Sequence, residues 1–128
     1  MPLDNASPFS PLPADRIIVE TPNTVAFYDL YPLTNGHALV VPKATVASLY
    51  ELDPSIQAEI WDTVRRVRDI LAGRFRPDGF NIGINDGAAA GQTVPHAHVH
   101  IIPRYAGDVP DPRGGIRWIL PSKARYWA

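Results

Sequence analysis

The chain has 128 residues, of which 45% are hydrophobic and 20% charged, and its formal net charge is −1. This length suits one domain, and the near-neutral charge differs from the strongly basic balance of general nucleic-acid binders. The absence of cysteine excludes disulfides, cysteine-ligated zinc and thiol catalysis. No apolar run reaches the roughly 18 residues of a membrane span, and the start lacks the basic residues of a secretory signal. We therefore expect a cytoplasmic protein without a membrane or nucleic-acid partner.

The N-terminal part of the chain predicts an arm followed by three strands. The arm, residues 1–13, holds four prolines and shows little periodicity. Three β-rich runs follow it, at residues 16–20, 24–29 and 37–41. The first two runs flank the break at residues 21–23, which is typical of a hairpin turn, and a second turn at residues 33–36 precedes the third run. Pro42 stops that third strand.

One long helix is predicted over residues 53–75. Asp53 followed by Pro54 is typical of a helix start, with the aspartate as N-cap and the proline at the first helical position. Apolar residues then recur at spacings of three and four, which places them in one stripe on the helix. The stripe consists of Ile56, Ile60, Val64, Val67 and Leu71.

Two further strands are predicted in the C-terminal half, at residues 79–85 and 96–103. A tail, residues 104–128, carries five basic and two acidic groups between its prolines and glycines. Strands outnumber helices and most neighbours are joined by short turns, so the fold class is α+β. We expect a single domain over residues 1–128, with one long helix packed on an antiparallel sheet.

The four histidines fall in two places, His37 after a turn and the other three on one predicted strand. Residues at i, i+2 and i+4 of a strand share a face, so His96, His98 and His100 line one side. A solvated polar face is the simplest interpretation. A three-histidine metal site is a second one, but a rise of about 3.3 Å per residue separates the outer Cα atoms by roughly 13 Å. That span does not suit one tetrahedral ion.

Nucleophilic catalysis is the third interpretation of the histidines. A neutral imidazole attacks phosphorus well near pH 7, and neighbouring rings can orient it. His98 is the best-placed nucleophile because it has a ring on each side. Upstream, Gly91, Gln92 and Thr93 offer N–H groups, an amide and a hydroxyl that suit phosphoryl oxygens.

The segment Gly91-Gln92-Thr93-Val94-Pro95-His96-Ala97-His98-Val99-His100-Ile101-Ile102 resembles the signature of the histidine triad (HIT) family. Residues 26–43 resemble the family's first conserved block, and residues 80–87 resemble the strand before the triad. The resemblance covers about residues 16–104. Residues 92–94 and 102–104 are most similar to the fragile-histidine-triad branch, the dinucleoside polyphosphate hydrolases.

This resemblance implies a five-stranded antiparallel sheet in a homodimer that joins two sheets. It also implies cleavage of nucleoside phosphate conjugates at the α-phosphorus through a nucleotidyl-histidine intermediate. The alternatives are a purine nucleoside phosphoramidase with the same residues, and a nucleotide-binding interaction protein with incidental catalysis.

The resemblance also implies a role for each site residue. His98 would be the nucleophile, His37 and His100 would contact the phosphate and leaving group, and His96 would support them. The substrate-binding candidates are Gln92 and Thr93 at the phosphate, Asp29 and Asn85 at the ribose, and Phe27, Leu30 and Ile17 or Ile18 at the nucleobase.

Many family members carry Cys-x-x-Cys near the start and a histidine after the Pro-Lys pair, and these residues bind structural zinc. Ser7, Ser10 and Thr45 stand at the corresponding places here. We expect no structural zinc and no required cofactor, although the substrate could arrive as a divalent-metal complex. The arm is then held by packing, with Phe9 and Leu12 as candidates.

Apolar residues beside the helix stripe predict the surface of the homodimer. Trp61, Ile70 and Phe75 would leave a wet apolar patch on a monomer, and such patches usually mark a partner surface. A two-fold dimer would cover this patch, with Trp118 and Trp127 of the tail near the shared surface.

Overall fold

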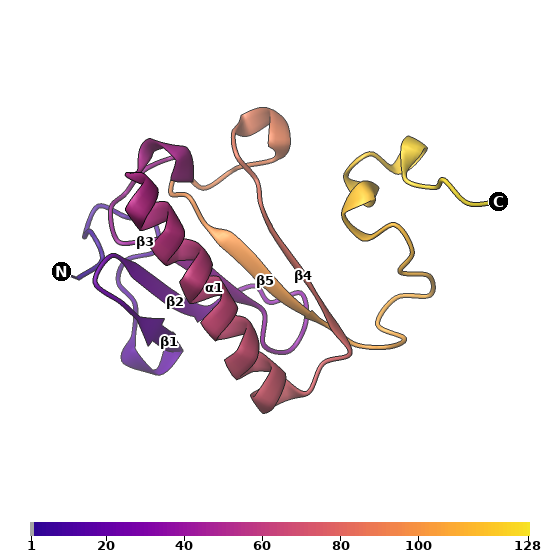
Figure 1. The fold of residues 1–128 in the computed structure, drawn as a ribbon, viewed down its shortest axis with the longest axis horizontal. Helices are drawn as coiled ribbons and strands as arrows, with labels where there is room; N and C mark the ends of the chain where they lie inside the picture. Colours follow the sequence, from indigo (N-terminus) through magenta and orange to yellow (C-terminus); the bar gives the residue numbers. More distant parts are fainter. Residues whose placement is uncertain (1) are drawn as a thin grey trace.

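Figure 1 shows a five-stranded antiparallel sheet with one long helix lying across one face. The computed structural model describes residues 2–128. The strand order is β1-β2-β3-β5-β4, so β1 and β4 form the two edges. The elements are β1 (Ile17–Glu20), β2 (Thr24–Tyr28), β3 (Ala38–Pro42), α1 (Pro54–Phe75), β4 (Gly79–Ile84) and β5 (Val99–Arg104). The predicted α+β class and the five-stranded sheet are confirmed.

The helix α1 begins and ends as the sequence predicts, with one difference at its start. Pro54 occupies the first turn, but the Asp53 side chain makes no capping hydrogen bond. The Asp53 carbonyl oxygen instead accepts from the N–H groups of Ile56 and Gln57. Asp53 is the N-cap residue, as predicted, but its carboxylate does not cap the helix. At the other end, Arg76 adopts a left-handed conformation with φ of 50° and closes the helix.

The predicted apolar stripe of α1 packs against one face of the sheet. Ile60, Val64, Val67 and Leu71 are buried there, while Ile56 is half-buried. Their partners include Ala26, Val40, Val99 and Ile101 from the three central strands. Each fully buried aliphatic side chain of this size contributes about 1.5–3 kcal/mol. This face holds the main core of the protein.

The N-terminal arm packs on the opposite face of the sheet. Alternation along the strands directs Val25, Phe27, Leu39 and Val41 to that face. Leu3, Phe9 and Leu12 of the arm cover these residues, together with Ile17. The prediction that packing of Phe9 and Leu12 holds the arm is confirmed. The arm covers the part of this face that belongs to β2 and β3.

The strand predicted over residues 96–103 begins only at Val99. The preceding backbone is bound elsewhere, because the Ala97 N–H donates to the Val46 carbonyl at 2.7 Å. His96 and His98 therefore lie on an irregular segment that leads into β5, and only His100 lies on the strand. This difference changes the surroundings of the three rings.

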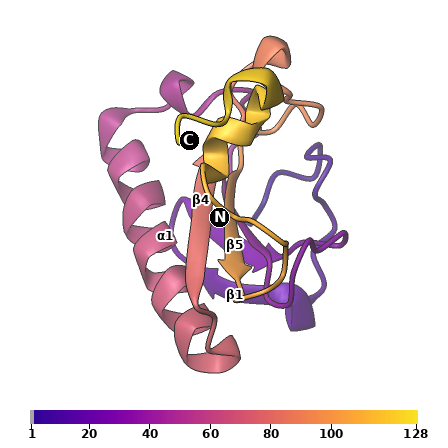
Figure 2. The ribbon, with the colours of Figure 1, turned by 90° about the vertical axis from the view of Figure 1, so that its right-hand side faces the viewer.

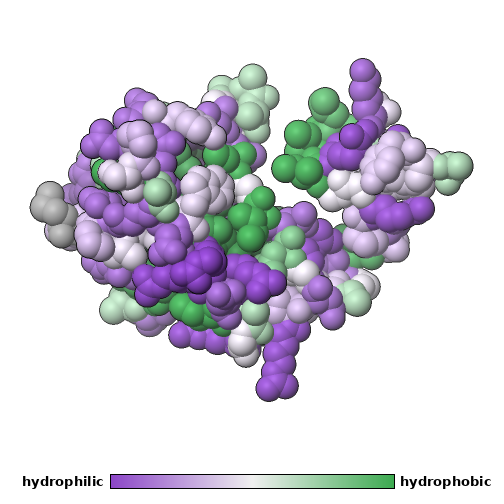
Figure 3. Space-filling view, viewed as in Figure 1, coloured by the Kyte–Doolittle hydropathy of each residue, from purple (hydrophilic) through white to green (hydrophobic). Residues whose placement is uncertain are grey.

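The tail beyond β5 extends past the β4 edge of the sheet (Figures 1 and 2). It contains two short 3-10 turns, Gly115–Ile119 and Pro121–Lys123. The space-filling view shows a hollow between the tail and the rest of the molecule, with apolar surface on both sides (Figure 3). Within residues 2–128, no helix has the length and apolar character needed to cross a membrane.

Candidate active site

The pairing of β3 with β5 brings the two groups of histidines together. Ala38 lies opposite Ile101 and Leu39 opposite His100 in this antiparallel pair, so His37, just before β3, lies diagonally across from His100. His37 Nε2 lies 3.0 Å from His100 Nδ1. The rings of His98 and His100 lie edge to face with centroids 5.0 Å apart. Three of the four predicted histidines therefore form one cluster.

A backbone donor sets the tautomer of His37. The Leu33 N–H donates to His37 Nδ1 at 3.0 Å, so the proton of the neutral ring must lie on Nε2. That Nε2–H donates to His100 Nδ1, and Asp29 Oδ2 lies 3.5 Å from the same nitrogen. His100 then carries its own proton on Nε2, where it can donate to a substrate oxygen.

A backbone acceptor sets the tautomer of His98. His98 Nδ1 lies 2.8 Å from the carbonyl oxygen of His96, which can only accept, so Nδ1 carries the proton. His98 Nε2 therefore keeps its lone pair. The geometry supplies a nucleophilic nitrogen beside the N–H donor of His100.

His96 differs from the other two histidines of the motif because its ring is buried. Its Nε2 donates to the Pro42 carbonyl oxygen at 2.8 Å, and its Nδ1 lies 2.5 Å from Ser7 Oγ. The interpretation of the three imidazoles as a solvated polar face is wrong for His96. Because both of its nitrogens are bound within the protein, His96 supports the site without facing a substrate.

Burial keeps three of the histidines neutral at pH 7. Desolvation is the main cause that lowers the pKa of His37 and of His96 below the ordinary 6.5. Burial also lowers the pKa of His100 to about 4, with the nearby rings of His98 and His37 acting in the same direction and Asp29 opposing them. The neutral state is the one that the hydrogen-bond pattern requires.

Asp29, His37 and His100 together also resemble a metal-binding group, since each offers a ligand atom within 4.8 Å of the others. A metal ion needs an unprotonated nitrogen facing it. The Leu33 N–H holds the lone pair of His37 on Nδ1, so Nε2, which faces the cluster, carries the proton. This group therefore suits a hydrogen-bonded relay better than a metal ion.

Gln92 is placed differently from the prediction. Its Oε1 accepts from the Gly87 N–H at 2.9 Å, and its Nε2 donates to the carbonyl oxygens of Ala47 and Val94. The amide therefore fixes the loop between β4 and the histidines, and no donor of the side chain is left for a phosphate. Thr93, the next residue, is exposed.

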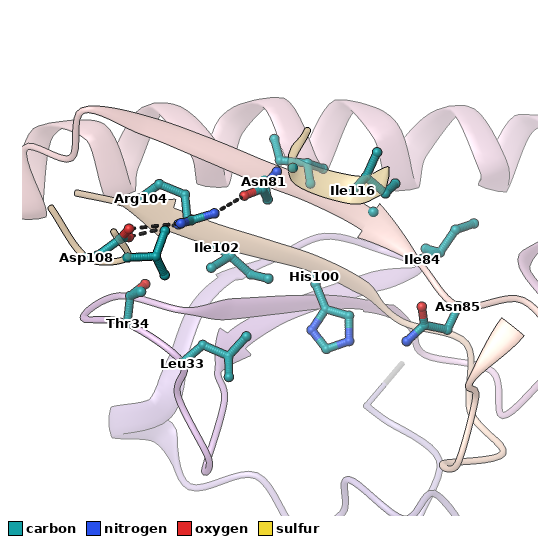
Figure 4. A pocket seen from close by; sticks show the side chains of 14 residues that line it. Leu33, Thr34, Asn81, Ile84, Asn85, His100, Ile102, Arg104, Asp108 and Ile116 are labelled. Atoms are coloured by element: carbon teal, nitrogen blue, oxygen red, sulfur yellow. Dashed lines mark hydrogen bonds and ion pairs between the residues drawn. The ribbon is translucent and has the colours of Figure 1, made fainter. Parts of the chain in front are cut away.

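The two ribose candidates both lie near histidines of the cluster, Asp29 near His37 and Asn85 near His100. Asp29 is half-buried after β2, where its Oδ1 accepts from the Tyr31 N–H at 3.0 Å. Asn85 follows β4 and lines the same cavity as His100 (Figure 4). Both predicted residues lie next to the cluster.

Of the nucleobase candidates, Phe27 and Ile17 are brought together, whereas Leu30 and Ile18 lie elsewhere. Phe27 is fully buried, with the Phe9 ring at 5.4 Å and the Arg16 guanidinium at 5.4 Å from its centroid. Leu30 is 64% exposed, and Ile18 packs in the core on the helix side of the sheet. The choice of Ile18 is wrong for this site, because Ile17 is the residue that lies opposite Phe27 and shares its face.

Phe9 is the contact that sequence reasoning missed. Its ring lies 5.4 Å from Phe27, 5.3 Å from His96 and 5.4 Å from His98. A single aromatic residue in a proline-rich arm belongs to no periodic pattern, so nothing in the sequence connects it to the histidines.

A cavity of about 710 Å³ extends from His100, the one histidine of the cluster that lines it, along β4 and β5 (Figure 4). His100 and Asn85 lie at one end, and Arg104 lies at the other. Arg104 is fully paired, because it contacts both carboxylate oxygens of Asp108 at 2.8 and 2.9 Å and Asn81 Oδ1 at 2.6 Å. The walls between the ends are mainly apolar, and Ile116 of the tail closes one side. This volume is within the range of small-molecule sites.

Comparison with known proteins identifies the family of this chain. Residues 13–107 match the HIT domain. The bis(5'-nucleosyl)-tetraphosphatase of Schizosaccharomyces pombe is 43% identical over 101 residues, which are 78% of this chain and 56% of that protein. The chain thus spans about half the length of this relative.

Solved structures of similar proteins share the fold. The NitFhit protein of Caenorhabditis elegans superimposes with a TM-score of 0.73 at 40% identity, covering 80% of this chain and 25% of that one. A zinc-bound histidine triad family protein from Mycobacterium smegmatis gives a TM-score of 0.67 at 37% identity, covering 74% of this chain and 73% of that one.

Proposed function

The chain belongs to the HIT domain family, and on this premise we propose that it cleaves dinucleoside polyphosphates or related nucleoside phosphate conjugates at the α-phosphorus. The observation that carries the proposal is the tautomer of His98, whose Nδ1–H donates to the His96 carbonyl and leaves Nε2 free. The substrate class is supported by the relative named as a bis(5'-nucleosyl)-tetraphosphatase.

The first step is an in-line displacement at phosphorus. The lone pair of His98 Nε2 forms a bond to the α-phosphorus, and the phosphorus–oxygen bond to the leaving group breaks. The electron pair goes to the bridging oxygen, so the nucleoside polyphosphate leaves as an anion and requires no proton. His100 Nε2–H donates to a phosphoryl oxygen as charge develops on it.

The second step releases the nucleotide. The intermediate ring carries phosphorus on Nε2 and a proton on Nδ1, so it is positively charged and is stabilised by the His96 carbonyl. The oxygen of a water molecule attacks the phosphorus, and the phosphorus–nitrogen bond breaks. The electron pair returns to His98 Nε2, the water proton goes to solvent, and nucleoside monophosphate is formed.

A substrate panel on the wild type and on His98→Ala tests this function. We expect the wild type to cleave a dinucleoside polyphosphate faster than an adenosine phosphoramidate, and the variant to cleave neither. The reverse preference would identify a phosphoramidase. Nucleotide binding without turnover of any panel member would indicate an interaction protein and contradict the proposal.

We also propose that the protein is a homodimer that joins two sheets at β4. Among the described strands, β4 pairs only with β5, so its other edge has free backbone donors and acceptors. Ile82 of β4 is 39% exposed, and Trp61 of α1 is 47% exposed. Ile70 and Phe75, also named for the predicted patch, are partly buried and pack against the core.

Four further predictions concern the partners, the location and the cofactors of the protein. The absence of a nucleic-acid partner is supported by the net charge of −1. The cytoplasmic location, the nucleotide as substrate partner and the absence of a required cofactor stay predictions from the sequence.

A further inference from the structure

Ser7 is a buried polar residue of the arm that contacts the catalytic motif directly. Its side chain is 4% exposed, and its Oγ lies 2.5 Å from Nδ1 of His96, 89 residues further along the chain. The Phe9 N–H donates to the same Oγ at 3.1 Å. A serine in an arm that otherwise packs through apolar side chains therefore makes a specific polar contact.

The direction of the bond between Ser7 and His96 follows from the partners on either side. His96 Nε2 carries the proton, because it donates to the Pro42 carbonyl oxygen. His96 Nδ1 is therefore an acceptor, and the Ser7 hydroxyl donates to it. Burial lowers the pKa of His96, which keeps this nitrogen unprotonated and able to accept. Both nitrogens of the ring are thus fixed from opposite sides.

His96, fixed in this way, in turn orients His98. The carbonyl oxygen that accepts from His98 Nδ1 belongs to His96 itself. A shift of the His96 ring would move this carbonyl and loosen the contact that fixes the His98 tautomer. The arm also contacts His98 directly through Phe9. The two rings lie edge to face, with centroids 5.4 Å apart and an interplanar angle of 78°.

We propose that Ser7 is a positioning residue of the active site, which holds His98 in its reactive tautomer and orientation by fixing His96. The inference rests on the proposed function, because it assigns His98 the role of nucleophile. The N-terminal arm then belongs to the catalytic machinery as well as to the packing of the sheet.

The test compares Ser7→Ala with Ser7→Thr, which retains the hydroxyl, and with Ser10→Ala as a matched control in the same arm. Turnover of a dinucleoside tetraphosphate gives kcat and KM, and ¹⁵N NMR of the imidazole nitrogens reports the tautomers of His96 and His98. We expect Ser7→Ala to lower kcat roughly 10- to 100-fold with KM changed by less than about threefold. The His98 nitrogen shifts should move toward a mixture of tautomers.

The controls separate positioning from general stability. Ser7→Thr should restore most of kcat, and Ser10→Ala should match the wild type in kcat and nitrogen shifts. If Ser7→Ala does not fold, Ser7→Cys takes its place, because a thiol of similar size is a weaker donor, and a smaller drop in kcat is expected. Wild-type kcat and His98 shifts in the folded Ser7→Ala or Ser7→Cys variant would overturn the inference, as would a failure of threonine to restore kcat.

The NMR measurement also keeps this inference distinct from the proposed function. It requires no substrate, so the tautomers respond to Ser7 whether or not a dinucleoside polyphosphate is cleaved. A protein that cleaves none of the panel but shows the expected shifts would contradict the function and leave the positioning role of Ser7 intact.

Discussion

His37 and His100 are 63 residues apart in the sequence, yet Nε2 of the first lies 3.0 Å from Nδ1 of the second. The β3–β5 register makes this contact, and the Leu33 N–H gives it a direction. The proton of His37 points to His100, which leaves the proton of His100 on Nε2. A pair of neutral rings therefore forms a directed donor beside His98, the proposed nucleophile.

The His98→Ala variant is expected to lose turnover while its affinity for nucleoside monophosphate stays within about tenfold. The nucleophile acts mainly in the transition state, so removing it affects kcat more than binding. Kinetics and titration calorimetry measure the two effects. Mass spectrometry of a quenched reaction should find the nucleotidyl group on His98 alone. Modification of another histidine, or near-normal turnover of the variant, would refute the mechanism.

The free energy of unfolding is expected to fall as the pH drops from about 7.5 to 5. The unfolded chain binds protons at His37, His96 and His100 near the ordinary pKa of 6.5, whereas folding lowers the pKa of all three. The unfolded state therefore holds more protons in this range, and acid favours it. The expected loss is on the order of 2 kcal/mol.

Urea unfolding at several pH values checks this dependence. Carboxylates titrate mainly below this range, so histidines dominate the slope. His100→Asn should flatten the slope because it removes one of the three groups. A flat profile in the wild type between pH 7.5 and 5 would contradict the assignment of buried neutral histidines.

The sequence predicts the scaffold of the site better than the contacts within it. Alternation and the helical stripe place β4 and α1 nearly to the residue, because burial of one face imposes a period on the sequence. The same rule fails at His96, which alternation assigns to the face of His98. The backbone leaves the ladder there, since Ala97 bonds to Val46, and the ring turns to Pro42.

Long-range polar contacts leave even less trace in the sequence. Ser7 and His96 lie 89 residues apart, and a single serine in an arm has no period that points to a partner. At Gln92 the sequence suggests a contact that the structure does not make. An amide beside the triad could donate to a phosphate, but the Gln92 side chain accepts from Gly87 and donates to Ala47 and Val94.

Gly36→Ala is expected to destabilise the protein by about 1–3 kcal/mol. Gly36 has a φ of +89°, and a Cβ there would lie 2.8 Å from the Phe75 ring. Gly73→Ala in the interior of α1 is the matched control, since a Cβ there meets no atom within 4 Å. Alanine is the better helix former, so the control should gain about 0.5–1 kcal/mol. Thermal unfolding measures the stability of both variants. Equal changes in the free energy of unfolding would contradict the requirement for glycine at position 36.

The purified protein is expected to contain no stoichiometric zinc, and chelators should leave its melting temperature unchanged. Ser7 and Thr45 offer hydroxyls in place of thiolate and imidazole, and Ser7 already binds His96. Elemental analysis and thermal unfolding with and without EDTA provide the measurements. About one zinc per chain would refute the expectation and make the histidines the candidate ligands.

The protein is expected to be a homodimer at micromolar concentration, with a mass near twice 14.1 kDa by light scattering. A second copy that pairs with β4 would satisfy its free backbone groups and cover Trp61 and Ile82, and a two-fold axis makes the contact self-complementary. Trp61→Arg should weaken association by placing a charge in that contact, whereas Tyr50→Arg, at an exposed position outside the proposed contact, should not. A mass near 14.1 kDa for the wild type at these concentrations would exclude the dimer. A dimer that survives Trp61→Arg unchanged would exclude Trp61 from the contact and leave the β4 edge as its site, because backbone pairing does not depend on that side chain.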